Sequence, residues 1–132
     1  MTWPEIFILF FATHQCGDYL LQTDWQATHK RNGLGRDAAA RRALFTHTFT
    51  YSLAYVPAFI WIQTRLGFNT LIIAAAVSIP HLVQDDGRLL RAYLRRVKGM
   101  DPVANHVVAA IVDQALHIIA LFGAALLVSA LL

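Results

Sequence analysis

The stretch FATHQCGDYLLQTDW, residues 11–25, places His14, Asp18 and Gln22 at four-residue intervals near the start of a chain that is otherwise largely apolar. Residues four apart lie on the same face of an α-helix, about one turn from each other. Aliphatic and aromatic side chains occupy half of the remaining positions and supply an apolar surface, as in a helix that faces lipid. The stretch therefore predicts a helix that turns a polar stripe toward other helices and an apolar surface outward.

The composition of the whole chain is typical of a membrane protein. Of its 132 residues, 57% are hydrophobic and only 14% are charged, a combination outside the usual range for a soluble domain of this size. A span needs about 20 mostly apolar residues, so the chain has room for roughly four spans and no separate soluble domain. The net charge of +3 comes from basic residues between the apolar runs. This placement indicates a topology signal rather than a nucleic-acid interface.

The predicted fold is all-α: an integral membrane four-helix bundle that forms one domain, residues 1–132. The stretch TRLGFNT, residues 64–70, supplies Gly and Asn for a tight turn between the second and third spans. At the start of the fourth span, Asp101 can cap the free amides and Pro102 fits the first helical position. The expected spans are residues 3–22, 43–64, 70–86 and 103–131.

The basic residues fall almost entirely on one side of the predicted bundle. Five of them, Lys30 to Arg42, follow the first span, five more, Arg88 to Lys98, follow the third, and only Arg65 lies on the opposite side. By the positive-inside rule both long loops are cytoplasmic and both termini are outside. The expected location is the cell inner (cytoplasmic) membrane, crossed several times, and Lys30 is interpreted as a topology charge.

The loop after the third span contains the stretch RLLRAYLRRVKGM, residues 88–100, in which apolar residues and arginines alternate at helical spacing. This pattern predicts a short amphipathic helix that lies on the inner leaflet. The same arginines could instead bind an anionic substrate.

Three of the four spans carry a His and an Asp four residues apart, and the second span carries a His near its start. The order is His then Asp in the first and third spans and reversed in the fourth, which runs in the opposite direction. The aspartate is therefore closer to the cytoplasm in all three pairs. Seven side chains are expected to meet in the cytoplasmic half of the bundle: His14, Asp18, His47, His81, Asp85, Asp113 and His117.

These side chains are candidate metal ligands. A charged group at the centre of a membrane helix costs at least ~2.5 to 3.5 kcal/mol, so three aspartates need compensation. A divalent cation supplies it, and imidazole nitrogen with carboxylate oxygen suits zinc, iron or manganese, as one ion or as two ions about 3.5 to 4 Å apart. Zinc or iron is the expected cofactor. A proton or ion pathway, and a set of His–Asp hydrogen bonds that holds the bundle together, remain alternatives.

Other polar residues extend or flank this set. Tyr51 and Tyr55 continue the stripe from His47, where they can orient a ligand, donate a proton or pack in the interior. The residues expected at the interface or in solvated loops are Gln22, Asp86, His29 and His106.

Four stretches carry a family resemblance: THQCGDYLLQTDWQATHK (13–30), LFTHTFTYSL (44–53), IPHLVQDDGR (79–88) and VDQALHIIAL (112–121). They resemble the bacterial and phage membrane proteins grouped as domain of unknown function 3307, over nearly the whole chain. The resemblance implies a fold and a residue set but no reaction, and Arg88 departs from it, because the family usually has a lysine there. Carried over, the family pattern falls on His14, Asp18, Gln22, Trp25, Lys30, His47, His81, Asp85, Asp113, Gln114 and His117.

The expected function is that of an intramembrane metal-binding protein, with a metal-dependent hydrolase as the enzyme class that the ligands suggest. Asp18 or Asp113 could act as a base, with Gln22, Tyr51 and Gln114 supporting the site. The lipid bilayer is the expected partner and a lipid-like or membrane-associated molecule the expected substrate. The alternatives are a non-enzymatic carrier or channel subunit for protons or divalent cations, and a structural membrane factor with a polar core.

Overall fold

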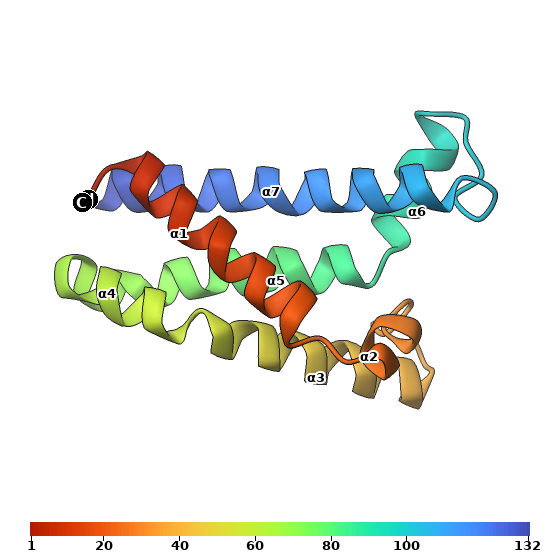
Figure 1. The fold of residues 1–132 in the computed structure, drawn as a ribbon, viewed down its shortest axis with the longest axis horizontal. Coiled ribbons are helices and arrows are strands. Elements are labelled where there is room, and N and C mark those ends of the chain that lie inside the picture. Colours follow the sequence, from red (N-terminus) through yellow and green to blue (C-terminus); the bar gives the residue numbers. More distant parts are fainter.

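The computed structural model describes residues 1–132, and every regular element in it is helical, which confirms the all-α prediction. The first and last helices lie side by side, and both chain ends lie at one end of the molecule (Figure 1). The shorter helices α2 and α6 lie at the opposite end (Figure 1). The helices are α1 (Trp3–Gln15), α2 (Asp24–His29), α3 (Ala38–Ala54), α4 (Val56–Leu66), α5 (Thr70–Asp85), α6 (Arg88–Arg96) and α7 (His106–Leu131).

Helix α1 continues into a π-helical turn, Cys16–Leu20. Such turns insert a wider loop of backbone into a helix and are frequent at functional sites. Gly17 in this turn faces α3: a methyl group built on it would lie 2.7 Å from Cδ2 of Tyr51. Only glycine therefore allows the π-helical turn and α3 to approach this closely.

Helix α2 brings the chain back against α3 after the π-helical turn. Thr23 and Gln26 form a reciprocal capping box at its start, in which Gln26 N donates to Thr23 Oγ1 at 3.2 Å and Thr23 N donates to Gln26 Oε1 at 2.9 Å. The Gln26 side chain also reaches Thr46 of α3 at 3.4 Å. Lys30, the residue that follows α2, is consequently held inside the molecule and is only 7% exposed.

The expected second span, residues 43–64, consists of two helices rather than one. Helix α3 begins earlier than expected, because Asp37 caps it by accepting from Ala39 N at 2.8 Å and Ala40 N at 3.0 Å. It ends at Ala54, and α4 begins at Val56. Pro57 explains the interruption, since a proline ring collides with the carbonyl four residues earlier and restricts the residue before it.

The last helix begins later than the sequence predicts. Asp101 Oδ1 accepts from Val103 N at 3.2 Å, but residues 102–105 form a turn and α7 begins at His106. The Asn105 side chain donates to the carbonyl of Asp101 at 3.0 Å, which holds the turn closed and competes with helix formation. The helix therefore starts at His106, about one turn later than the start at Pro102 that the sequence predicts.

Two segments are long and apolar enough to cross a membrane, judged by length and composition alone. One is Val56–Asp85, which contains α4, the short 3₁₀ turn Gly67–Asn69 and α5, and the other is α7. Only 28% and 33% of their most apolar windows are buried inside the molecule. These segments overlap the expected third and fourth spans and part of the second, and the expected first span is not among them.

An apolar core joins α1, α4, α5 and α7, with Ile6, Ile62 and Val128 fully buried within it. At its edge, Tyr51 and Tyr55 mark the transition to the polar side chains. The hydroxyl of Tyr51 lies 3.1 Å from that of Tyr55, which donates to the carbonyl of Phe10 at 2.8 Å. The core therefore anchors the tyrosines that border the candidate site.

Candidate metal centre

Four buried polar side chains from three segments of the chain meet between the helices. Asp18 comes from the π-helical turn, His47 from α3, and His81 and Asp85 from α5. One donor atom from each residue lies within 4.8 Å of the other three, and Asp18, the most exposed of the four, is only 6% exposed. We refer to these four residues as the His/Asp group.

His47 Nε2 lies close to a donor atom of each of the other three residues of the His/Asp group. It is 3.1 Å from Asp18 Oδ1, 2.9 Å from Asp85 Oδ2 and 3.1 Å from His81 Nε2. His81 Nε2 is 3.1 Å from Asp85 Oδ2 and 3.9 Å from Asp18 Oδ1. Bonds of about 2.0 to 2.2 Å to a tetrahedral zinc ion place neighbouring ligand atoms about 3.3 to 3.6 Å apart. Four of these five separations are slightly shorter than this range and one is longer, so the group could hold a four-coordinate divalent ion after small side-chain shifts.

Both histidine rings of the group present the same nitrogen to its centre. The Nδ1 atoms of His47 and His81 have no hydrogen-bond partner, so the rings make their polar contacts through Nε2. The His81 ring also stacks on Tyr51, with centroids 3.4 Å apart and planes 4° from parallel. Because Tyr51 is anchored through Tyr55, this stacking fixes the plane of the His81 ring.

Lys30 lies in the site, although the charge pattern of the sequence explains it only as a topology signal. Its Nζ is 2.9 Å from Asp85 Oδ2 and 3.9 Å from Asp18 Oδ1. With the Gln22 amide oriented so that both of its polar atoms find partners, it accepts from Lys30 Nζ at 2.8 Å and donates to the carbonyl of Asp18 at 3.0 Å. Lys30 therefore places a positive charge beside both carboxylates, and Gln22 holds it there.

His14 lies next to the His/Asp group but not in it. Its Nδ1 is 3.2 Å from the Tyr51 hydroxyl and its Nε2 is 3.1 Å from Gln114 Oε1. Gln114 in turn donates to Asp18 Oδ2 at 3.1 Å. Both ring nitrogens of His14 are thus occupied, and its role in this geometry is to orient Gln114, which orients Asp18.

His117 and Asp113 of α7 lie on the other side of Asp85. His117 Nε2 is 3.5 Å from Asp85 Oδ1 and has no hydrogen-bond partner, while its Nδ1 is 2.9 Å from the carbonyl of Asp113. Asp113 Oδ2 is 3.4 Å from Arg31 Nη2, and Asp113 Oδ1 is buried without a partner. A second ion, if bound, would have Asp85 Oδ1 and His117 Nε2 available as ligands.

Asp86 is buried rather than interfacial as expected. Its Oδ1 accepts from Leu34 N at 2.8 Å, and its Oδ2 lies 2.8 Å from Arg88 Nε. It therefore holds the loop before α3 against the start of α6, and Asp85 is the carboxylate that faces the His/Asp group. His29 and His106 are exposed, as the sequence predicts.

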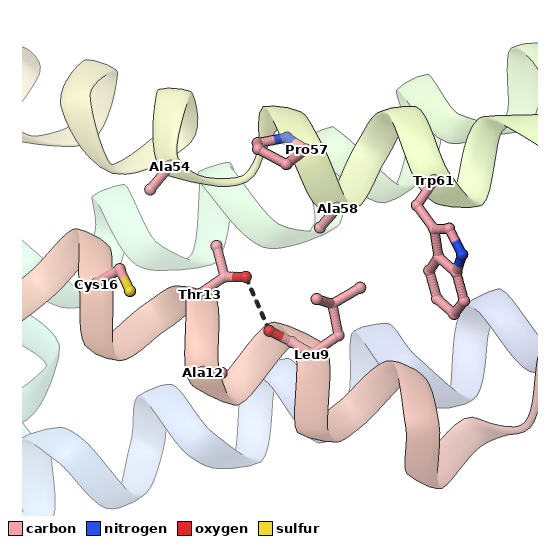
Figure 2. Close-up of a pocket in the computed structure, with 8 residues that line it drawn as sticks. All are labelled: Leu9, Ala12, Thr13, Cys16, Ala54, Pro57, Ala58 and Trp61. Carbon is pink, nitrogen blue, oxygen red and sulfur yellow. Dashed lines mark hydrogen bonds between the residues drawn. The ribbon is translucent and has the colours of Figure 1, made fainter.

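A large apolar cavity lies elsewhere, between α1 and the junction of α3 and α4 (Figure 2). Its volume is about 530 Å³, and Cys16, Pro57 and Trp61 are among its lining residues. Figure 2 shows the Thr13 hydroxyl turned back to the carbonyl of Leu9, 2.8 Å away. None of the His/Asp group lines this cavity, so it is not the chemical site.

Comparison with known proteins identifies the family of the chain. No curated protein and no solved structure matches it. A family model described as "Protein of unknown function (DUF3307)" matches residues 6–131, which confirms the resemblance seen in the sequence. The chain that brings Asp18, His47, His81 and Asp85 together is thus a member of the DUF3307 family.

Proposed function

We propose that this chain is a multi-pass membrane protein that binds a divalent cation, zinc or iron, at the His/Asp group and uses it to hydrolyse a lipid-like substrate. The observation that carries the proposal is the convergence of two imidazole nitrogens and two carboxylate oxygens, all buried, at separations that suit one ion. This donor set is one that zinc and iron(II) accept.

The chemistry follows from the charge of the cation and the residues around it. Held by Asp18, His47, His81 and Asp85, a divalent cation would supply Lewis acidity to the site. Asp113 is the candidate base, because its Oδ1 is buried, has no hydrogen-bond partner and lies on the helix that also carries His117. Asp18 belongs to the His/Asp group, so its carboxylate is better placed to bind the cation than to act as the base.

The surface of the long helices supports a membrane location. Large apolar side chains point outward from each of them: Ile8 on α1, Phe49 on α3, Ile60 on α4, Leu71 on α5 and Ile119 on α7 are all at least 60% exposed. Soluble monomers rarely expose apolar surface on this scale. A bilayer around four spans would cover these side chains, with α6 at its surface.

The polar side chains favour a binding site over a pathway through the molecule. The hydrogen-bonded chain runs from His14 through Tyr51 to Tyr55 and ends on the carbonyl of Phe10. Beyond this point the core is apolar. A carrier or channel for protons or cations needs polar groups that continue to the other face of the molecule. The apolar core interrupts such a path, so transport ranks second to metal binding as a candidate function.

Elemental analysis of the detergent-purified chain tests the proposal. We expect about one equivalent of zinc or iron in the wild type and its loss in Asp18→Asn and His81→Ala, because each removes a ligand from a four-coordinate site. His29→Ala is the matched control, since His29 is exposed on α2 and outside the group. His14→Ala should retain the metal, because both nitrogens of His14 are engaged elsewhere.

Each outcome has a definite meaning. A wild type that stays metal-free after reconstitution with zinc, iron and manganese would refute the metal site, and proton-flux measurements in liposomes would then test the transport alternative. If the metal is present, hydrolysis of labelled lipids in nanodiscs should stop on chelation and resume when the metal is restored. Metal binding without any metal-dependent turnover would reject the hydrolase part of the proposal.

A further inference from the structure

A second polar feature lies outside the His/Asp group, where the loop before α3 meets α6 and the start of α7. A cavity of about 240 Å³ opens there, lined among others by Arg31, Leu90, Arg91, Val103 and His106. No carboxylate is among its lining residues. We call it the arginine cavity. The positive charge and the apolar wall of this cavity determine which ligand it can bind.

The two arginines of the cavity converge on one point. A methyl group built on Gly87, whose φ is +74°, would lie 2.5 Å from Arg31 Nη1 and 3.1 Å from Arg91 Nη1. Arg91 has no carboxylate within ion-pair distance and bonds only to the side-chain oxygen of Asn32. Burial, followed by the nearby charge of Arg31, lowers the pKa of Arg91. Two like charges held together, with Asp113 the only carboxylate paired to either of them, favour the binding of an anion.

The start of α7 adds to the positive potential of the cavity. This helix has 26 residues, and the side chain of its N-terminal flanking residue, Asn105, makes no capping hydrogen bond. The first backbone amides therefore lack a capping acceptor, and the helix dipole places partial positive charge at this end. His106, the first residue of α7, lines the cavity. Guanidinium groups and free amides together are the donors that recognise phosphate.

The surroundings of the cavity indicate an amphiphile rather than a fully soluble anion. Leu90 and Val103 form apolar parts of its lining, and Val103 is 76% exposed. Val107 and Ile111, which lie one turn apart in the first part of α7, are 60% and 64% exposed. We propose that the arginine cavity binds the phosphate group of a membrane amphiphile, whose apolar part lies along the exposed side chains of α7. The further step, that this amphiphile is the substrate, rests on the proposed function.

The arginine cavity is connected to the metal centre through Asp113. Arg31, which lines the cavity, is 3.4 Å from Asp113, and Asp113 precedes His117 by one helical turn. A neighbouring cavity, also about 240 Å³, is lined by Asp113 and shares Leu90 with the arginine cavity. A phosphate held by Arg31 and Arg91 would draw Arg31 toward the ligand. The adjacent part of the amphiphile would then lie beside the candidate base.

Lipid binding to the purified full chain in detergent tests this proposal, with dihexanoyl phosphatidic acid as the probe. Arg91→Gln should weaken its binding by about tenfold to a hundredfold, the effect of losing a charge-assisted hydrogen bond. Arg96→Gln is the matched control, because it removes the same charge from the same helix but does not line the cavity. Dihexanoyl glycerol, which lacks the phosphate, should bind poorly to all three proteins.

Equal weakening by Arg91→Gln and Arg96→Gln would overturn the assignment of the cavity. Binding of glycerol 3-phosphate or inorganic phosphate as tight as that of phosphatidic acid would overturn the assignment to an amphiphile. The His81→Ala variant separates this proposal from the metal site, since it should lose metal and still bind phosphatidic acid. A wild type that stays metal-free after reconstitution with zinc, iron and manganese but binds the lipid would refute the proposed function alone, whereas metal-loaded wild type that does not bind the lipid would refute the lipid site alone.

Discussion

Replacing Lys30 by methionine should destabilise the metal-free protein strongly. Lys30 Nζ is 2.9 Å from Asp85 Oδ2, a separation at which two unit charges attract by about 6 kcal/mol for an effective dielectric constant of about 20. Desolvation offsets part of this attraction, and removal of one partner of a buried ion pair costs about 3 to 5 kcal/mol. We therefore expect Lys30→Met to lower the unfolding free energy by that amount when a chelator is present.

The same substitution should cost much less once zinc is bound. The cation then neutralises Asp18 and Asp85, and the ammonium group of Lys30 no longer has an unpaired carboxylate to stabilise. A remaining loss of about 1 kcal/mol implies that Lys30→Met binds zinc more tightly than the wild type by roughly two orders of magnitude. Thermal unfolding in detergent, with chelator and with saturating zinc, measures both quantities.

Lys98→Met is the control for this experiment, because Lys98 is exposed and makes no ion pair. It should leave both unfolding free energies nearly unchanged. Equal losses for Lys30→Met with chelator and with zinc would refute the competition between Lys30 and a cation. So would an unchanged or weaker zinc affinity in the variant.

Two further substitutions test the packing around the site. Gly17→Ala should destabilise by about 1 to 3 kcal/mol, because its methyl group would lie 2.7 Å from a ring carbon of Tyr51; Gly123→Ala, with nothing within 4 Å, should be neutral or slightly stabilising. Asp86→Asn should cost about 1 to 3 kcal/mol by weakening the bond to Leu34 N, and the exposed Asp24→Asn less than about 1 kcal/mol. Thermal unfolding measures the loss for each substitution and its control. Similar losses for Gly17→Ala and Gly123→Ala, or for Asp86→Asn and Asp24→Asn, would contradict the contacts described.

The sequence predicts the polar pairs well because helical spacing and chain direction determine which side chains can share a face and a depth. His81 and Asp85 lie together in the His/Asp group for that reason, one turn apart on α5. The same helical spacing predicts that His14 lies beside Asp18 as a ligand. With the π-helical turn at Cys16–Leu20, however, Asp18 belongs to the His/Asp group and His14 lies outside it. Nothing in the spacing of His14 and Asp18 indicates that turn, so His14 could not be told apart from a ligand.

Two features that the sequence analysis missed did leave a signal in the sequence. Thr23 and Gln26 have the spacing of a capping box, which predicts a short helix before Lys30 and a return of the chain toward the bundle. Pro57 likewise predicts an interruption of the second span. The ion pair of Lys30 with Asp85 is different, because it depends on the packing of α2 against α3 and no local pattern contains that information.

The stacking of His81 on Tyr51 has a kinetic consequence. His81 cannot swing out of the group without moving Tyr51, which is tied through Tyr55 to the backbone of α1. Lys30, by contrast, follows a helix of only six residues, and elements of that size open locally at a small cost in free energy. An ion entering or leaving the group would therefore pass on the Lys30 side, and the opening rate of α2 would limit how fast it exchanges.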